Sequence, residues 1–160
     1  MKKLEEGWTP SQFVPWIMDT CMVSREKAVL SWMIANKEQE QLAPLDCENG
    51  YSLYVGIPFC PSTCLYCSFT SYPLGKWEKR VDEYLDALEK EIHFTAVKFQ
   101  HKKLNSIYIG GGTPSVLSAD MFERLLAALR QVGHPCDFEE FTVEVNPEDI
   151  VEKGHSYVEG

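Results

Sequence analysis

The sequence lacks any long apolar run, and it is poor in basic residues. No hydrophobic stretch approaches the ~18 residues that a membrane span requires. Lys and Arg together number 15 against 24 Asp and Glu, so the formal net charge is −9. Nucleic acids and anionic membranes are polyanions that such a charge repels. We therefore expect no nucleic acid and no membrane among the partners.

The N-terminus also lacks the apolar stretch of a signal peptide, because a single leucine and then two glutamates follow its lysines. We therefore expect a cytoplasmic protein, in which the six cysteines are free or metal-bound rather than paired in disulfides. The composition, 44% hydrophobic and 24% charged, is that of an ordinary globular protein. A chain of 160 residues is long enough to bury one core.

The chain divides into a lead-in and an alternating segment. Residues 1–50 are predicted to form a helical N-terminal extension, a packing or docking appendage with no chemical motif, in which Ser24 caps a helix. Residues 51–160 alternate strand and helix, which indicates parallel α/β structure. The predicted elements are strand 51–57, helix 76–100, strand 105–109, helix 119–131 and strand 141–145.

Right-handed crossovers bring the C-terminal ends of parallel strands to one edge of the sheet. The loops that follow the three predicted strands carry a cysteine cluster, a glycine run and Asn146. We expect these three loops to share one edge, where α/β enzymes of this class place their chemistry.

The cysteine cluster IPFCPSTCLYCSF has the spacing Cys-x3-Cys-x2-Cys and contains Cys60, Cys64 and Cys67. Three thiolates can hold three irons of a cubane cluster and leave the fourth iron open, and an open metal position is typical of reactivity. The alternatives are packed free thiols, a disulfide with one spare thiol, or zinc with a fourth ligand from elsewhere.

Cys-x3-Cys-x-aromatic-Cys after a strand resembles the signature of the radical S-adenosylmethionine (SAM) superfamily. Tyr66 fills the aromatic position, which the superfamily packs near the adenine of SAM. The resemblance implies a [4Fe–4S] cluster on the three cysteines and SAM as the second cofactor. It also implies a (β/α)6 barrel, of which this chain holds about three strands and is therefore truncated.

The run Gly110, Gly111, Gly112, Thr113 and Pro114 follows a strand and precedes a helix. Glycines there let the backbone approach a ligand closely, although a glycine run alone can be only a tight turn. The run resembles the superfamily motif whose backbone receives the amino group of SAM, with Thr113 where many members have Glu. The GGGTP form is similar to one branch, the oxygen-independent coproporphyrinogen III oxidases, coproporphyrinogen dehydrogenases and related haem chaperones.

Two further residues match that branch. Strand alternation puts Tyr54 on the face opposite Leu53 and Val55, and it puts Glu144 on the face opposite Val143. The branch places SAM contacts at both positions. Without the resemblance, Glu144 would be taken for an exposed strand carboxylate.

The resemblance implies that one electron from reduced flavodoxin or ferredoxin cleaves SAM to methionine and a 5′-deoxyadenosyl radical. That radical would decarboxylate the propionates of coproporphyrinogen III oxidatively, giving protoporphyrinogen IX in haem biosynthesis. A haem chaperone or haem-metabolising relative and a non-catalytic metal-binding fragment are the alternatives. No residue is assigned to catalysis or substrate binding. The chain alone is expected to bind a cluster poorly and to turn over no substrate.

The other cysteines, Cys21, Cys47 and Cys136, are isolated and are expected to be packed thiols. The four histidines show no ligand spacing and are expected on the surface.

Overall fold

The computed structural model describes residues 6–46, 48–69, 71–132 and 139–154. The chain forms two compact units, Met1–Leu45 and Asp46–Gly160. The predicted domain division after residue 50 stays a prediction. Within the described ranges, no helix combines the length and the apolar character needed to cross a membrane.

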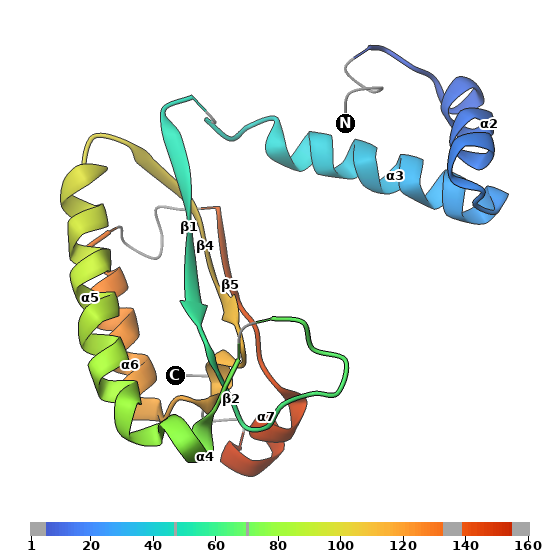
Figure 1. Ribbon diagram of the computed structural model, residues 1–160. Helices are drawn as coiled ribbons and strands as arrows, with labels where there is room; N and C mark the ends of the chain where they lie inside the picture. Colours follow the sequence, from blue (N-terminus) through green and yellow to red (C-terminus); the bar gives the residue numbers. More distant parts are fainter. Residues whose placement is uncertain (1–5, 47, 70, 133–138, 155–160) are drawn as a thin grey trace. The chain divides into compact units, whose positions relative to one another are not determined.

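The described part of the first unit contains the helices α2 (Pro10–Cys21) and α3 (Arg25–Leu42), drawn in blue and in light blue to cyan in Figure 1. Ser24 caps α3 as predicted, because its side-chain oxygen accepts a hydrogen bond from a backbone N–H in the first turn. Aromatic side chains join the two helices, with the rings of Phe13 and Trp32 5.2 Å apart.

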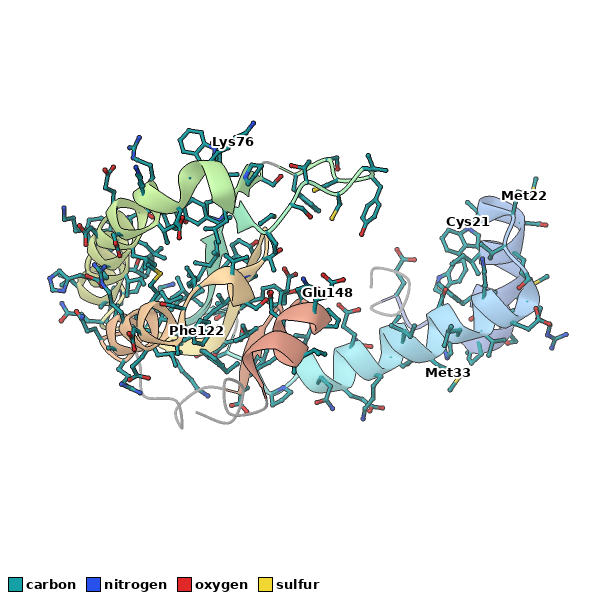
Figure 2. The ribbon with its side chains drawn as sticks, turned by 90° about the horizontal axis from the view of Figure 1, so that it is seen from below. Cys21, Met22, Met33, Lys76, Phe122 and Glu148 are labelled. Atoms are coloured by element: carbon teal, nitrogen blue, oxygen red, sulfur yellow. The ribbon has the colours of Figure 1, made fainter. Side chains whose placement is uncertain are left out.

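The expectation of a packed thiol at Cys21 is wrong. Cys21 is exposed at the end of α2, beside Met22, which caps the helix in the left-handed conformation (Figure 2). A helix end faces solvent on most sides, so its last residue is not covered by the packing of the helices. Cys47 and Cys136 lie outside the described residues.

The second unit contains a parallel sheet of three strands in the order β1-β4-β5. The strands are β1 (Gly50–Ile57), β4 (Lys103–Gly111) and β5 (Glu140–Val143). Ile57 pairs with Gly111, and Ile109 pairs with Val143, so all three strands end at the same edge. The predicted parallel α/β structure is thus confirmed, and its three strands end at the edge where the loops were expected to meet.

Helices α5 (Val81–Lys98) and α6 (Ala119–Leu129) cover one face of this sheet (Figure 1). Val55 and Ile57 of β1 point into the core between sheet and helices, whereas Tyr54 points to the opposite face. The period-2 alternation of the strand therefore holds. The buried core consists of Val55, Ile57, Phe59, Val81, Leu85, Leu88, Ile92, Leu104, Ile107, Ile109, Leu117, Leu125, Ala128 and Leu129.

The single helix predicted over residues 76–100 is interrupted. It is divided into α4 (Leu74–Trp77), a 3₁₀ turn (Glu78–Arg80) and α5. Trp77 packs edge-on against Tyr72, with ring centroids 5.1 Å apart, while α5 packs against the sheet. Because the two parts face different partners, the chain changes direction between them.

A second, two-stranded sheet closes the cysteine loop and was not predicted. Strand β2 (Phe59–Cys60) pairs in parallel with β3 (Tyr72–Pro73), and the Tyr72 N–H donates to the Pro58 carbonyl oxygen at 2.8 Å. The two ends of the loop are therefore held together.

The predicted third strand ends two residues early, at Val143, and helix α7 (Pro147–Lys153) follows it. The side chain of Asn146 caps α7, Pro147 occupies its first turn and two acidic residues follow. This combination is a common helix start, so the sequence did carry the signal.

Candidate functional site

Three loops meet at the carboxyl edge of the sheet, one after each strand (Figure 1). The Gly112 N–H donates to the Ile57 carbonyl at 2.7 Å, and the Thr113 N–H donates to the Phe59 carbonyl at 2.8 Å. These bonds join the glycine run to the start of the cysteine loop. The Glu144 N–H donates to the carbonyl oxygen of Ile109 at 2.9 Å, which joins the third loop to the central strand.

The three cysteines share one loop but differ in burial. Cys60 is 9% exposed in β2, Cys67 is half-buried and Cys64 is exposed. The Cys67 N–H donates to the Cys64 carbonyl at 3.0 Å, so these two form one tight turn. Among the described residues, no three His, Cys, Asp or Glu side chains are gathered as a metal site. The three thiols therefore lie on one loop without converging.

Tyr66 lies on the exposed arc of this loop and is itself 90% exposed. A hydrogen bond to the Cys64 sulfur, followed by the charges of Cys64 and Cys67, raises the pKa of the Tyr66 phenol. The predicted aromatic position is thus close to Cys64.

The glycines leave room that no other residue would leave. A Cβ built on Gly112 would lie 2.5 Å from the Phe59 carbonyl oxygen and 2.8 Å from the Cys60 sulfur. Gly111 has φ +114°, a conformation that favours glycine. Gly112 therefore brings its backbone directly against the first cysteine of the cluster.

A hollow of about 210 Å³ opens beside this junction. Its lining is largely apolar. The hydroxyl of Tyr84, one of the lining residues, donates a hydrogen bond to the Gly56 carbonyl. Burial is the first cause of the raised pKa of Tyr84, and the nearby Glu91 and Tyr54 add to it. The lining residues are Gly56, Ile57, Pro58, Phe69, Tyr84, Gly111 and Gly112.

On the open face of the sheet, Tyr54 stacks on Tyr108 with ring centroids 5.8 Å apart and an interplanar angle of 15°. The Tyr108 hydroxyl donates to Glu144 Oε1 at 2.6 Å, and the Gly111 N–H donates to Oε2 at 3.3 Å. The structure thus brings together the predicted Tyr54, Glu144 and glycine run. It joins them through Tyr108, which our sequence analysis did not single out.

A buried polar contact supports the same edge from behind. The Ser115 hydroxyl donates to Asp149 Oδ2, and the Asn146 N–H donates to Ser115 Oγ at 3.0 Å. Both Ser115 and Asp149 are buried. This contact ties the segment after the glycine run to α7. Asn146 was expected at this edge from the sequence, but the hydrogen bond between Asn146 and Ser115 was not predicted.

A family model described as the radical SAM superfamily matches residues 54–154 of the chain. The chain belongs to the radical SAM superfamily. The matched segment contains the cysteine loop, the glycine run and Glu144, and it confirms the family that the motifs predicted.

Relatives in this superfamily fall in the branch that the GGGTP form indicated. The chain is 43% identical over 100 residues to "Heme chaperone HemW" of Bacillus subtilis, covering 62% of this chain and 26% of that protein. It is 30% identical over 154 residues to "Oxygen-independent coproporphyrinogen-III oxidase-like protein HemZ" of Bacillus subtilis. This match covers 94% of this chain and 31% of that protein.

A solved structure agrees with these relatives. The coproporphyrinogen III oxidase HemN of Escherichia coli, described as a radical SAM enzyme, superposes with a TM-score of 0.53 at 30% identity. The superposition covers 72% of this chain and 28% of the oxidase. The chain thus spans about a quarter to a third of the length of these relatives.

Radical SAM proteins use SAM and an iron–sulfur cluster, and the residues present fit such groups. The donor set is three thiols on one loop, and thiolates are the ligands that iron–sulfur clusters take. The glycine run packs against the Cys60 sulfur because residue 112 has no side chain, and the hollow of about 210 Å³ opens beside this contact. The three thiols and the adjoining hollow therefore fit a sulfur-ligated cluster with a small molecule beside it.

Replacing Gly112 with alanine tests this close approach. The added methyl would overlap the Phe59 carbonyl and the Cys60 sulfur, so we expect Gly112→Ala to lower the free energy of unfolding by about 1–3 kcal/mol. The matched control is Gly75→Ala in α4, where a Cβ meets nothing within 4 Å. Urea denaturation of both variants gives the comparison, and equal stability of Gly112→Ala and wild type would contradict the close approach.

The titration of Tyr108 tests its bond to Glu144. That hydrogen bond, then burial and the charges of Glu144, Tyr54 and Glu140, raise the pKa of Tyr108. The contribution of the protonated Tyr108 to the stability of the fold is complete below the pKa of an unfolded tyrosine. It is lost as the pH rises through the higher pKa of the folded state. We expect Glu144→Gln to lower the Tyr108 pKa in an NMR titration of labelled tyrosine rings. The pKa of Tyr51, raised by burial alone, should stay unchanged as the control.

Proposed function

We propose that this chain holds a [4Fe–4S] cluster on Cys60, Cys64 and Cys67 and binds SAM beside it for reductive cleavage. The observation that supports this most strongly is the contact between the cysteine loop and the glycine run, in which Gly112 lies against the Cys60 sulfur. The proposal requires the exposed Cys64 and the half-buried Cys67 to close on Cys60 when the cluster is bound.

The SAM site would extend from this junction over the open face of the sheet. The glycine run would offer backbone groups to the amino-acid end of SAM, and Tyr66 would pack near its adenine. The polar residues of the open face would complete the contacts. The residues proposed for SAM are Tyr54, Tyr66, Gly110, Gly111, Gly112, Thr113 and Glu144.

When bound, the cluster supplies one electron to the sulfonium of SAM, which yields methionine and a 5′-deoxyadenosyl radical. We propose coproporphyrinogen III as the substrate. Its propionate side chain would give one hydrogen atom to the radical and then lose carbon dioxide and one electron to a one-electron acceptor, leaving a vinyl group. Reduced flavodoxin or ferredoxin in the cytoplasm would be the electron donor.

The chain's own residues would orient and shield these groups. Gly112 N–H and Thr113 N–H, bonded to the Ile57 and Phe59 carbonyls, hold the glycine run against the cysteine loop. Tyr84 fixes the Gly56 carbonyl on the apolar side of the hollow. These contacts keep the backbone rigid where the cofactor would lie.

A haem-handling chaperone is the second candidate. The 43% identity over 100 residues with "Heme chaperone HemW" favours it. The two candidates share the cofactor segment, so they differ in the ligand bound rather than in the cysteine loop. A haem titration distinguishes them, because a chaperone binds haem and forms no vinyl product from coproporphyrinogen III.

The test is anaerobic reconstitution with iron and sulfide. It is performed on the chain and, where its reading frame continues beyond Gly160, on the longer product, because we expect the chain alone to bind a cluster poorly. Iron, sulfide and visible absorption are measured, and then 5′-deoxyadenosine is measured after addition of SAM and reductant. We expect Cys60→Ala, Cys64→Ala and Cys67→Ala each to lose the cluster and the product.

Cys21→Ala is the matched control, since Cys21 is an exposed thiol in the first unit. It should keep wild-type iron content. Zinc in place of iron, or a cluster that survives replacement of all three loop cysteines, would refute the proposed site. If the protein binds a cluster but forms no 5′-deoxyadenosine, the proposed metal site is supported and the proposed SAM cleavage is refuted.

A further inference from the structure

Like residues pair across β1 and β4 on the open face of the sheet. The register sets Ser52 opposite Ser106, Tyr54 opposite Tyr108 and a glycine opposite a glycine. The two serine hydroxyls are hydrogen-bonded at 2.8 Å, and the two tyrosine rings are stacked. The pairs thus form a short ladder that runs toward the carboxyl edge and the glycine run.

Gly110 lets the Tyr108 ring extend toward that edge, whereas a side chain at Gly56 would only touch the Tyr54 ring. A Cβ on Gly110 would lie 2.7 Å from Tyr108 Cε1, and a Cβ on Gly56 would lie 3.5 Å from Tyr54 Cε1. The Tyr108 ring therefore occupies the space that a side chain at residue 110 would take. From this position its hydroxyl reaches the carboxylate of Glu144.

Glu144 is held at both oxygens by donors from the central strand. Tyr108 donates to Oε1 at 2.6 Å, and the Gly111 N–H donates to Oε2 at 3.3 Å. Two donors on different oxygens fix the orientation of a carboxylate plane, and the shorter bond comes from the tyrosine. A carboxylate oxygen accepts more than one hydrogen bond, so each oxygen keeps capacity for a ligand.

We propose that Tyr108 is a positioning residue that holds Tyr54 by stacking and Glu144 by hydrogen bonding in the arrangement that binds SAM. This inference rests on the proposed function. It assigns Tyr108 no contact with the reacting atoms, because its hydroxyl is already donated to Glu144.

A role in stability alone fits the surroundings poorly. Tyr54 is 62% exposed and Tyr108 is 39% exposed, and the hydrogen bond to Glu144 is also solvent-exposed. Exposed polar contacts contribute little to folding. The geometry of the contact, rather than its contribution to stability, is therefore what a substitution should change.

The test compares SAM affinity in wild type and variants by equilibrium dialysis, using the longer product where the reading frame continues beyond Gly160, reconstituted anaerobically as above. Tyr108→Phe keeps the stacked ring and removes the donor, and we expect it to weaken SAM binding about tenfold. Iron content should not change, and the NMR resonance of the labelled Glu144 carboxyl should shift. Tyr51→Phe is the control, since it removes a phenol from the far end of the neighbouring strand β1 and should alter neither signal.

A double-mutant cycle separates positioning from general damage. If Tyr108 acts through Glu144, the double variant Tyr108→Phe with Glu144→Gln should bind SAM no more weakly than Glu144→Gln alone. Additive losses, or wild-type affinity in Tyr108→Phe while Glu144→Gln is weakened, would overturn the inference and leave the proposed function standing. Absence of SAM binding in the wild type would overturn the proposed function and this inference together.

Discussion

The parallel register between β1 and β4 is the constraint on which the site depends. Ile57 pairs with Gly111, so the cysteine loop and the glycine run leave the sheet at the same height. A slip of one residue would turn every side chain of β1 to the other face. Tyr54 would then enter the helix-covered core, and Val55 would face solvent. Burial of Val55 and Ile57 against α5 and α6 therefore positions Tyr54 and the start of the loop indirectly.

Each glycine of the run meets a different requirement. Gly110 leaves space for the Tyr108 ring, Gly111 adopts a positive φ, and Gly112 approaches the Cys60 sulfur. A side chain at any one of them would disturb a different contact of the site. The run is therefore more than a tight turn, because a turn alone would require only the conformation of Gly111.

Local patterns predicted the parts of the fold that follow from burial or capping. Alternation in β1 and the cap at Ser24 depend on neighbours in sequence, and both agree with the structure. The interruption after Trp77 coincides with its packing against Tyr72, a contact that the helical spacing of residues 76–100 did not indicate. Tyr108 was missed for a different reason, because its partner Glu144 lies 36 residues away and is reached only once the strands pair. The cysteine spacing predicted the loop, but spacing does not determine whether the thiols converge.

The open face of the sheet carries hydroxyl and carboxylate groups that do not suit a second hydrophobic core. Parallel sheets are ordinarily covered on both faces, yet β1 and β4 expose Ser52 and the two stacked tyrosines beside Glu144. The described residues contain no cation paired with that carboxylate, and burying it unpaired under apolar side chains would cost several kcal/mol. Hydroxyl and carboxylate groups at these positions can instead bond to a polar ligand or to water. The side chains of this face therefore fit contact with water or with a polar ligand better than they fit a second apolar core.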